Sequence, residues 1–256
     1  MAKSLKILIP VGLHYDYLNL VPLINKFEAN AQFNEICLYH AYEPPQIRGK
    51  ALPQTMKDLM DDDEKSIKKI LNNHAKVFKR LLKSNTKIKT SVRKNRPVQG
   101  IKNKIKRYKP DIVMMTTQQN MGISRYINSS HALKLMNQLD IPILILPQDY
   151  EFKKDIRLNF LIQNFENLEL AKKLTKGFKS IFDEIKFIHR DPTHMVKSTD
   201  EIKVVSSIEN YIQKSKNDEV FMLIRKKKPV LQTVLSKGFV DRLVGLNQAP
   251  VIIINQ

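Results

Sequence analysis

The sequence predicts an α/β protein built on doubly wound parallel sheets, and three observations lead to this fold class. Short, apolar, β-branched runs alternate with longer segments in which apolar residues recur three or four positions apart, as in strands followed by helices. This alternation implies right-handed crossovers and a parallel sheet with helices on both faces. The chain has 256 residues, 42% of them hydrophobic. This length exceeds that of one average domain. We therefore expect two such domains in tandem, over 1–150 and 151–256.

The first half contains five predicted strands with helices between them. The strands are expected at 6–11, 34–42, 86–92, 111–117 and 141–147. The helices are expected at 16–31, 67–82, 98–108 and 129–139, with Pro22 in the first turn of its helix. Lysines in the third strand suit an exposed sheet edge that must not recruit other chains. In such a sheet the ligand crevice lies where the strand order reverses, which points to the loops after the first and fourth strands.

The second half repeats this order in a weaker form. Strands are expected at 157–163, 184–191, 202–205, 219–225 and 250–254, and helices at 168–182, 208–212 and 234–246. Only Asp191 to Asp200 joins its second and third strands, whereas a parallel crossover usually takes about a dozen residues or more. The second helix of this half is therefore expected to be lost or reduced to a turn.

Two pairs of segments match between the halves. IPILILPQ (141–148) matches APVIIINQ (249–256), and CLYHAYEP (37–44) matches KFIHRDPT (186–193), which aligns His40 with His189. Both last strands are strongly apolar, and an exposed edge of that kind invites pairing. We expect the two last strands, 142–147 and 250–255, to pair with each other within the chain.

Three stretches of the first half resemble the universal stress protein family in order and spacing. They are KILIPVG (6–12), CLYHAYEPP (37–45) and the segment from KPDIVMMTT to IPILILP (109–147). The resemblance covers 1–148, and 155–256 less specifically. It implies a Rossmann-like, adenine nucleotide alpha hydrolase-like fold in a tandem member with a degenerate second domain. It also implies a non-enzymatic, regulatory role in a stress response, in a family whose members either bind or do not bind nucleotides.

Nucleotide-binding members of that family carry three features that can be compared position by position. An aspartate follows the first strand, adenine lies against the backbone at the end of the second strand, and Gly-x2-Gly-x9-Gly-Ser/Thr follows the fourth. The resemblance places the aspartate at Gly12 and the backbone contact at Ala41. The glycine motif falls on Thr116, Gln119, Ser129 and Ser130. In the second half the same positions are Gln163, Ile224, Lys227, Lys237 and Gly238.

Each motif glycine of the first half, and the acid, has therefore been replaced. A phosphate cradle uses glycine because the ligand approaches the backbone closely, and a Cβ in a positive-φ conformation costs about 1 kcal/mol or more. Thr116 and Gln119 place side chains where the ligand would lie. We therefore expect no cofactor and no ATP bound in the usual family manner.

An alternative stays open, in which the same crevice binds ATP, AMP or another anion. The backbone N–H groups at a helix start, with the Ser129 and Ser130 side chains, can still form a weak anion site, although both serines also suit simple helix capping. Gly122 is either part of this loop site or a turn glycine. His14 and His131 are expected near the same edge as His40, but their spacing matches no metal motif.

The formal charge of +19 is concentrated in one part of the chain. The segment from Lys65 to Lys109 contains 17 Lys or Arg residues and no Asp or Glu. Such a surface attracts polyanions, including nucleic acid, with an affinity that falls as salt rises. The alternative is an ordinary solvated surface, since Phe78 and Tyr108 are the only aromatic residues there. The acidic run at 61–64 is expected at the start of the long helix.

Several function classes are not expected from this sequence. It contains no G-x-S-x-G, no G-x-x-x-x-G-K-[ST], no C-x-x-C and no H-E-x-x-H motif, so we expect no enzyme. Its single cysteine, Cys37, suits a reducing compartment, and no apolar run approaches the roughly 18 residues of a membrane span. We therefore expect a cytoplasmic protein that acts through an unidentified protein partner or ligand, with pairing of whole chains into a homodimer left open.

Overall fold

A computed structural model describes most of the chain. The described residues are 5–13, 16–28, 33–43, 54–117, 135, 139–147, 150–151, 156–162, 168–176, 179, 182–191, 198–199, 201–215, 218–225 and 249–255. The helix predicted at 234–246 and most of the one predicted at 129–139 lie outside these residues. None of the described helices is both long enough and apolar enough to cross a lipid bilayer.

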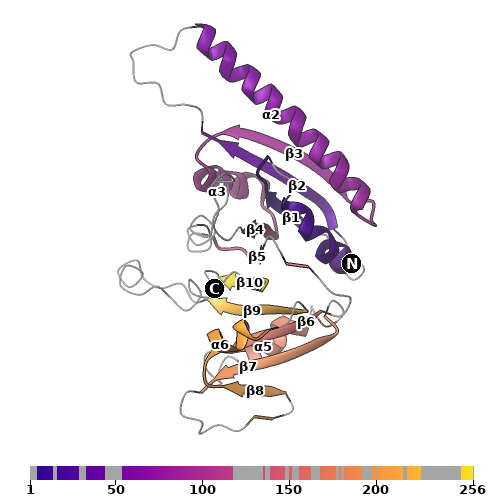
Figure 1. The fold of residues 1–256 in the computed structure, drawn as a ribbon, viewed down its shortest axis with the longest axis vertical. Coiled ribbons are helices and arrows are strands. Elements are labelled where there is room, and N and C mark those ends of the chain that lie inside the picture. Colours follow the sequence, from indigo (N-terminus) through magenta and orange to yellow (C-terminus); the bar gives the residue numbers. More distant parts are fainter. Residues whose placement is uncertain are drawn as a thin grey trace, which may run out of the picture.

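Ten strands form one continuous sheet, which runs along the long axis of the molecule (Figure 1). The order is β3-β2-β1-β4-β5-β10-β9-β6-β7-β8. The strands are β1 (Leu5–Pro10), β2 (Phe33–Tyr42), β3 (Lys87–Lys94), β4 (Ile112–Thr117), β5 (Ile143–Pro147), β6 (Arg157–Ile162), β7 (Glu184–Arg190), β8 (Ile202–Val205), β9 (Glu219–Arg225) and β10 (Val251–Asn255). In each half the first strand lies between the second and the fourth, so the strand order reverses there. The doubly wound parallel arrangement predicted from the sequence is confirmed.

Helices cover both faces of this sheet. One face carries the short helix η1 (Asp16–Leu20), α1 (Val21–Glu28), α2 (Gln54–Leu81) and α5 (Leu168–Thr175), and the other carries α3 (Pro97–Tyr108) and α6 (Ile208–Gln213). Neighbouring residues of a strand point to opposite faces of the sheet. Ile9 therefore packs into the core on the α2 side, called here the first core, while Leu8 packs into the core on the α3 side, called the second core. Both side chains are fully buried, as expected for strands of a parallel sheet covered on both sides.

The long helix begins earlier than the sequence pattern predicts. α2 starts at Gln54, so the acidic run at 61–64 lies inside the helix, and the prediction that it marks the helix start is wrong. Pro53 directly before a run of good helix formers is the signal that sequence reasoning overlooked. Glu64 accepts a hydrogen bond from the Tyr42 hydroxyl at 3.3 Å, which ties α2 to the end of β2.

The two halves are related by an internal repeat that the hydrogen bonds make visible. His40 in β2 contacts the carbonyl of Val11 through Nδ1 at 2.8 Å, and His189 in β7 makes the same contact with Ile162 at 3.4 Å. The alignment of His40 with His189 is therefore confirmed. Among the described residues between β7 and β8, no helix corresponds to α2. These two strands pair in parallel although only residues 191–201 connect them.

The last strands of the halves join the sheet into one. β5 and β10 run antiparallel, with Val251 opposite Ile145 and Ile253 opposite Ile143. This pairing is symmetric about Leu144 and Ile252, because the aligned residues of the two halves exchange places across it. The predicted pairing is confirmed, and it removes the two apolar edges. The edges that remain are the lysine-rich β3 and the four-residue β8, both poor templates for another chain.

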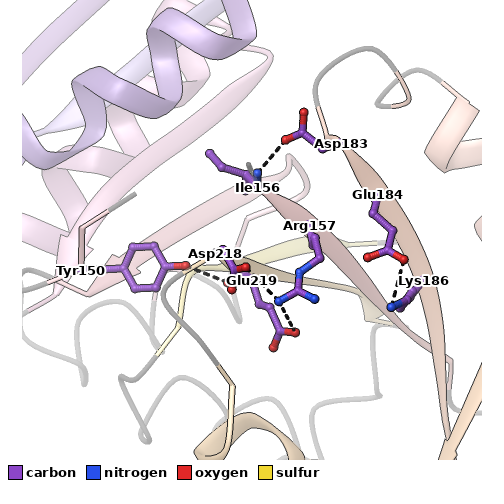
Figure 2. A network of polar contacts seen from close by, with 8 residues as sticks. All are labelled: Tyr150, Ile156, Arg157, Asp183, Glu184, Lys186, Asp218 and Glu219. Atoms are coloured by element: carbon purple, nitrogen blue, oxygen red, sulfur yellow. Dashed lines mark hydrogen bonds and ion pairs between the residues drawn. The ribbon is translucent and has the colours of Figure 1, made fainter. Parts of the chain in front are cut away.

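A polar network lies where the chain passes from one half to the other (Figure 2). The Tyr150 hydroxyl donates to the carbonyl of Glu219 at 3.0 Å, and the backbone N–H of Ile156 donates to the Asp183 carboxylate at 2.7 Å. The Asp183 carboxylate also pairs with Lys26 of α1, and the rings of Phe27 and Phe182 meet edge to face with centroids 6.2 Å apart. Contacts besides the β5–β10 pairing therefore hold the halves together.

Candidate functional site

The sheet brings three of the predicted site residues to one edge. Gly12 lies two residues after the end of β1, Ala41 lies near the end of β2, and Thr116 lies near the end of β4. Because β1 pairs in parallel with both β2 and β4, all three lie at the carboxyl end of adjacent strands. The other predicted residues lie outside the described part of the chain: His14, Gln119, Gly122, Ser129 and Ser130.

The side chains of these residues do not converge. Thr116 follows Met114 by two positions and therefore lies on the face of η1, α1 and α2, where it is 7% exposed. Ala41 belongs to the opposite core and lies next to Gly100 of α3. Gly12 is buried and offers no side chain for a ligand. What these three residues offer a ligand at this edge is backbone, together with the hydroxyl of a buried threonine.

His40 is the titratable side chain best placed at this edge, and it has a structural task. A carbonyl can only accept a hydrogen bond, so Nδ1 of His40 carries the proton that binds the Val11 carbonyl. Burial lowers the pKa of His40, an effect that the hydrogen bond to Val11 opposes. The ring thus stays neutral and holds the end of β1 against β2. His14 and His131, considered with it as metal ligands, lie outside the described residues.

The corresponding edge of the second half is more apolar. Ile224, at the position of the first motif glycine, is half-buried, packs against the first core and pairs with Ile254 of β10. The remaining positions carried over from the family motif lie outside the described residues: Gln163, Lys227, Lys237 and Gly238. A branched apolar side chain therefore occupies the one motif position that the structure describes in this half.

The basic segment 65–109 extends over three elements, namely α2, the edge strand β3 and α3. Acidic side chains compensate some of its charges. Lys89 pairs with Glu35, Arg96 lies 3.2 Å from Glu43, and Lys94 lies 4.0 Å from Glu64. The segment is thus not one uniform cationic surface.

Sequence reasoning missed a pocket between β3 and α3, called here the β3–α3 pocket. It has a volume of about 160 Å³. Its lining residues are Tyr39, Ser91, Arg93, Lys94, Asn95, Gly100, Asn103, Lys104 and Arg107. The four residues from α3 have the spacing i, i+3, i+4 and i+7, which places them on one face of a helix. That spacing, with the alternation of β3, is the signal that could have located the pocket.

Comparisons with known proteins identify the fold. No protein-family model and no curated protein matches the sequence. The structure is similar to a universal stress protein from Archaeoglobus fulgidus DSM 4304, with a TM-score of 0.62, 13% sequence identity, and coverage of 99% of this chain and 97% of that one. A candidate universal stress protein from Pseudomonas aeruginosa UCBPP-PA14 gives a TM-score of 0.60 at 11% identity, covering 98% and 93% of the two chains.

The fold is therefore that of the universal stress proteins, as the sequence resemblance implied. The cytoplasmic domain of a prokaryotic cation chloride cotransporter is also similar, with a TM-score of 0.50, 10% identity, and coverage of 98% of this chain and 95% of that one. Proteins with different tasks thus share this architecture. The function of this chain must be argued from its own residues.

Proposed function

We propose that the chain is a non-enzymatic, cytoplasmic universal stress protein that regulates a partner and does not bind ATP in the usual manner of that family. Thr116 carries the proposal. It holds the position of the first glycine of the nucleotide motif, and its side chain is 7% exposed within β4. A phosphate chain that approached this backbone would meet the threonine Cβ and methyl group, which a glycine does not present.

Two further observations support the loss of the ATP site. Gly12 stands where binding members have the aspartate, so no carboxylate is available at this position. In the second half, the apolar side chain of Ile224 replaces the equivalent glycine and packs against the core. Both crevices thus lack the aspartate and the first motif glycine of the nucleotide-binding members.

Isothermal titration with ATP and AMP tests this proposal. We expect no submicromolar binding by the purified full chain, whereas a nucleotide-binding universal stress protein titrated in parallel shows heat. The as-purified protein is also denatured, and the supernatant is assayed for nucleotide by absorbance and mass spectrometry. Submicromolar affinity for either nucleotide, or a stoichiometric co-purified nucleotide, would contradict the proposal.

The same material tests the alternative of an anion held at the start of the helix after β4. Thermal melting with a nucleotide panel would then show a stabilisation that Ser130→Leu abolishes. Ser66→Leu, at an exposed serine of α2, is the matched control and should leave the shift unchanged. The preferred proposal expects neither variant to differ from the parent chain with these ligands.

A further inference from the structure

We propose that the β3–α3 pocket binds the phosphate group of a small phosphorylated molecule, in addition to the function proposed above. The pocket lies on the α3 face of the sheet, beside the edge strand. Thr116 belongs to the opposite face, and Ala41 lies next to Gly100, but the lining of the β3–α3 pocket includes none of the residues predicted for the crevice at the strand ends. The inference does not depend on whether that crevice binds a nucleotide.

The local structure explains why cations gather here. Along β3, alternate residues face opposite sides. Val92 packs against the α2 side, while Ser91 and Arg93 join Tyr39 on the α3 side. Across from them, α3 presents its stripe of Gly100, Asn103, Lys104 and Arg107. Two separate patterns in the sequence thus converge on one cavity.

Gly100 allows the helix to lie close to the sheet. A Cβ at this position would be 2.7 Å from the Cβ of Ala41 and 2.8 Å from the Tyr39 hydroxyl oxygen, distances that real side chains do not adopt. The close approach brings the α3 stripe within reach of β3. The pocket therefore results from the packing of α3 against the sheet.

The charge of the pocket has one sign. Four of its nine lining residues are cationic, and none is acidic. Lys94 is partly compensated by Glu64 at 4.0 Å. In the described part of the chain, neither Arg93, Lys104 nor Arg107 has an ion pair with an acidic side chain. Like charges repel one another when they face one cavity, and a bound anion relieves that repulsion.

One of the cations, Lys104, is also held in place before a ligand binds. The Lys104 ammonium lies over two aromatic rings, 5.9 Å from the centroid of Tyr39 and 5.2 Å from that of Tyr108. Burial raises the pKa of Tyr39, while the positive charges of Arg93 and Arg107, which line the pocket with it, act in the opposite direction.

Neutral donors complete the site. The amide oxygen of Asn103 accepts a hydrogen bond from Gln99 at 3.1 Å, which leaves the Asn103 NH2 group as a donor. Ser91 and Asn95 add further polar groups to the lining. Guanidinium groups bind phosphate oxygens through paired N–H donors. Together with an ammonium group and amide donors, they offer enough hydrogen-bond donors for the several oxygens of a phosphate, whereas a carboxylate ligand has only two oxygens.

The volume limits the ligand. The β3–α3 pocket has a volume of about 160 Å³. Pockets for whole cofactors or drug-sized ligands are roughly 300–1,000 Å³. The site thus suits inorganic phosphate or a small phosphomonoester, and it is too small to enclose a nucleotide.

Two charge-matched double variants of the full chain test the proposal. Arg93→Gln with Arg107→Gln removes two cations from the pocket. Lys102→Gln with Lys106→Gln removes two cations from α3 that do not line it. The probes are inorganic phosphate, glycerol 3-phosphate and a duplex DNA oligonucleotide, titrated calorimetrically at constant ionic strength. Circular dichroism establishes that both variants are folded.

We expect phosphate and glycerol 3-phosphate to bind the parent chain. The pocket variant should weaken both at least about tenfold, since it removes charge-assisted hydrogen bonds, and the control variant less than about threefold. Equal weakening by the two variants, or binding of the DNA alone, would show a diffuse polyanion surface and overturn the proposal. Absence of phosphate binding at millimolar concentration would overturn it too. None of these outcomes bears on ATP at the strand-end crevice, which the Ser130 variant tests separately.

Discussion

Replacing Arg157 should destabilise the second half by an amount that depends on pH. The Arg157 Nη2 atom lies 2.9 Å from the Asp218 carboxylate and 3.4 Å from that of Glu219 (Figure 2). The three side chains are 29%, 21% and 11% exposed. An exposed pair contributes about 1 kcal/mol or less, and breaking a buried one costs about 3–5 kcal/mol. For this partly buried pair we expect Arg157→Met to lower the free energy of unfolding by about 2–3 kcal/mol at pH 7.

The pH dependence follows from Glu219. Burial raises its pKa above the usual 4.5, and Arg157 opposes that rise, so the pKa rises further in the variant. A carboxyl whose pKa is raised by folding stabilises the folded state when protonated, and this contribution is lost as the pH rises through the folded pKa. The cost of Arg157→Met should therefore be largest at neutral pH and shrink toward pH 4.5.

Urea unfolding at several pH values measures this cost. Arg157→Lys serves as the control, because it keeps the charge but lacks the planar guanidinium, and its cost should be smaller. A loss below about 1 kcal/mol at pH 7 would place the pair among ordinary surface ion pairs. A cost that does not change between pH 7 and pH 5 would contradict the assignment of Glu219 as the buried partner.

Three further predictions concern the packing of the fold. His40→Asn keeps a donor for the Val11 carbonyl but cannot titrate. Because folding lowers the pKa of His40, the parent chain loses stability as the pH falls below 6.5, and urea unfolding should show a shallower loss in the variant; identical slopes would refute this. Gly100→Ala gains about 1 kcal/mol of helix propensity, but the added methyl group meets Ala41 and Tyr39, at a cost of about 1–3 kcal/mol for overpacking. Thermal melting should therefore show a net loss of stability. A stabilised variant would contradict the close packing of α3. Phe182→Ala should cost about 3–5 kcal/mol, since the ring is 4% exposed and packs on Phe27 across the halves; a cost under about 1 kcal/mol in urea unfolding would mean that this contact contributes little.

The strands could be predicted well because their signal is local. β4 and β5 are continuous apolar runs, and a strand covered on both faces requires this composition irrespective of its neighbours. The early start of α2 at Gln54 was missed, since the pattern was read from its apolar residues. The reversal of the strand order between β1 and β4 was expected for a doubly wound sheet, a rule that does not depend on side-chain detail.

The candidate site was predicted only in part. Gly12, Ala41 and Thr116 do lie at one sheet edge, as the strand order requires. Their separation onto opposite faces is also a matter of strand alternation, which the comparison with a linear motif did not consider. The task of His40 was not predicted, because its partner, Val11, lies 29 residues away, directly after the neighbouring strand β1.

The sequence by itself determined the alternation of elements, the burial of the central strands and the protection of the β3 edge by lysine. These follow from the period of the apolar residues and from side-chain chemistry, which act locally. Only the tertiary structure decided which of the many cations in 65–109 share a cavity. Arg93 and Arg107 meet because β3 presents one of its faces to a helix that Gly100 allows to approach, and this depends on how the elements pack.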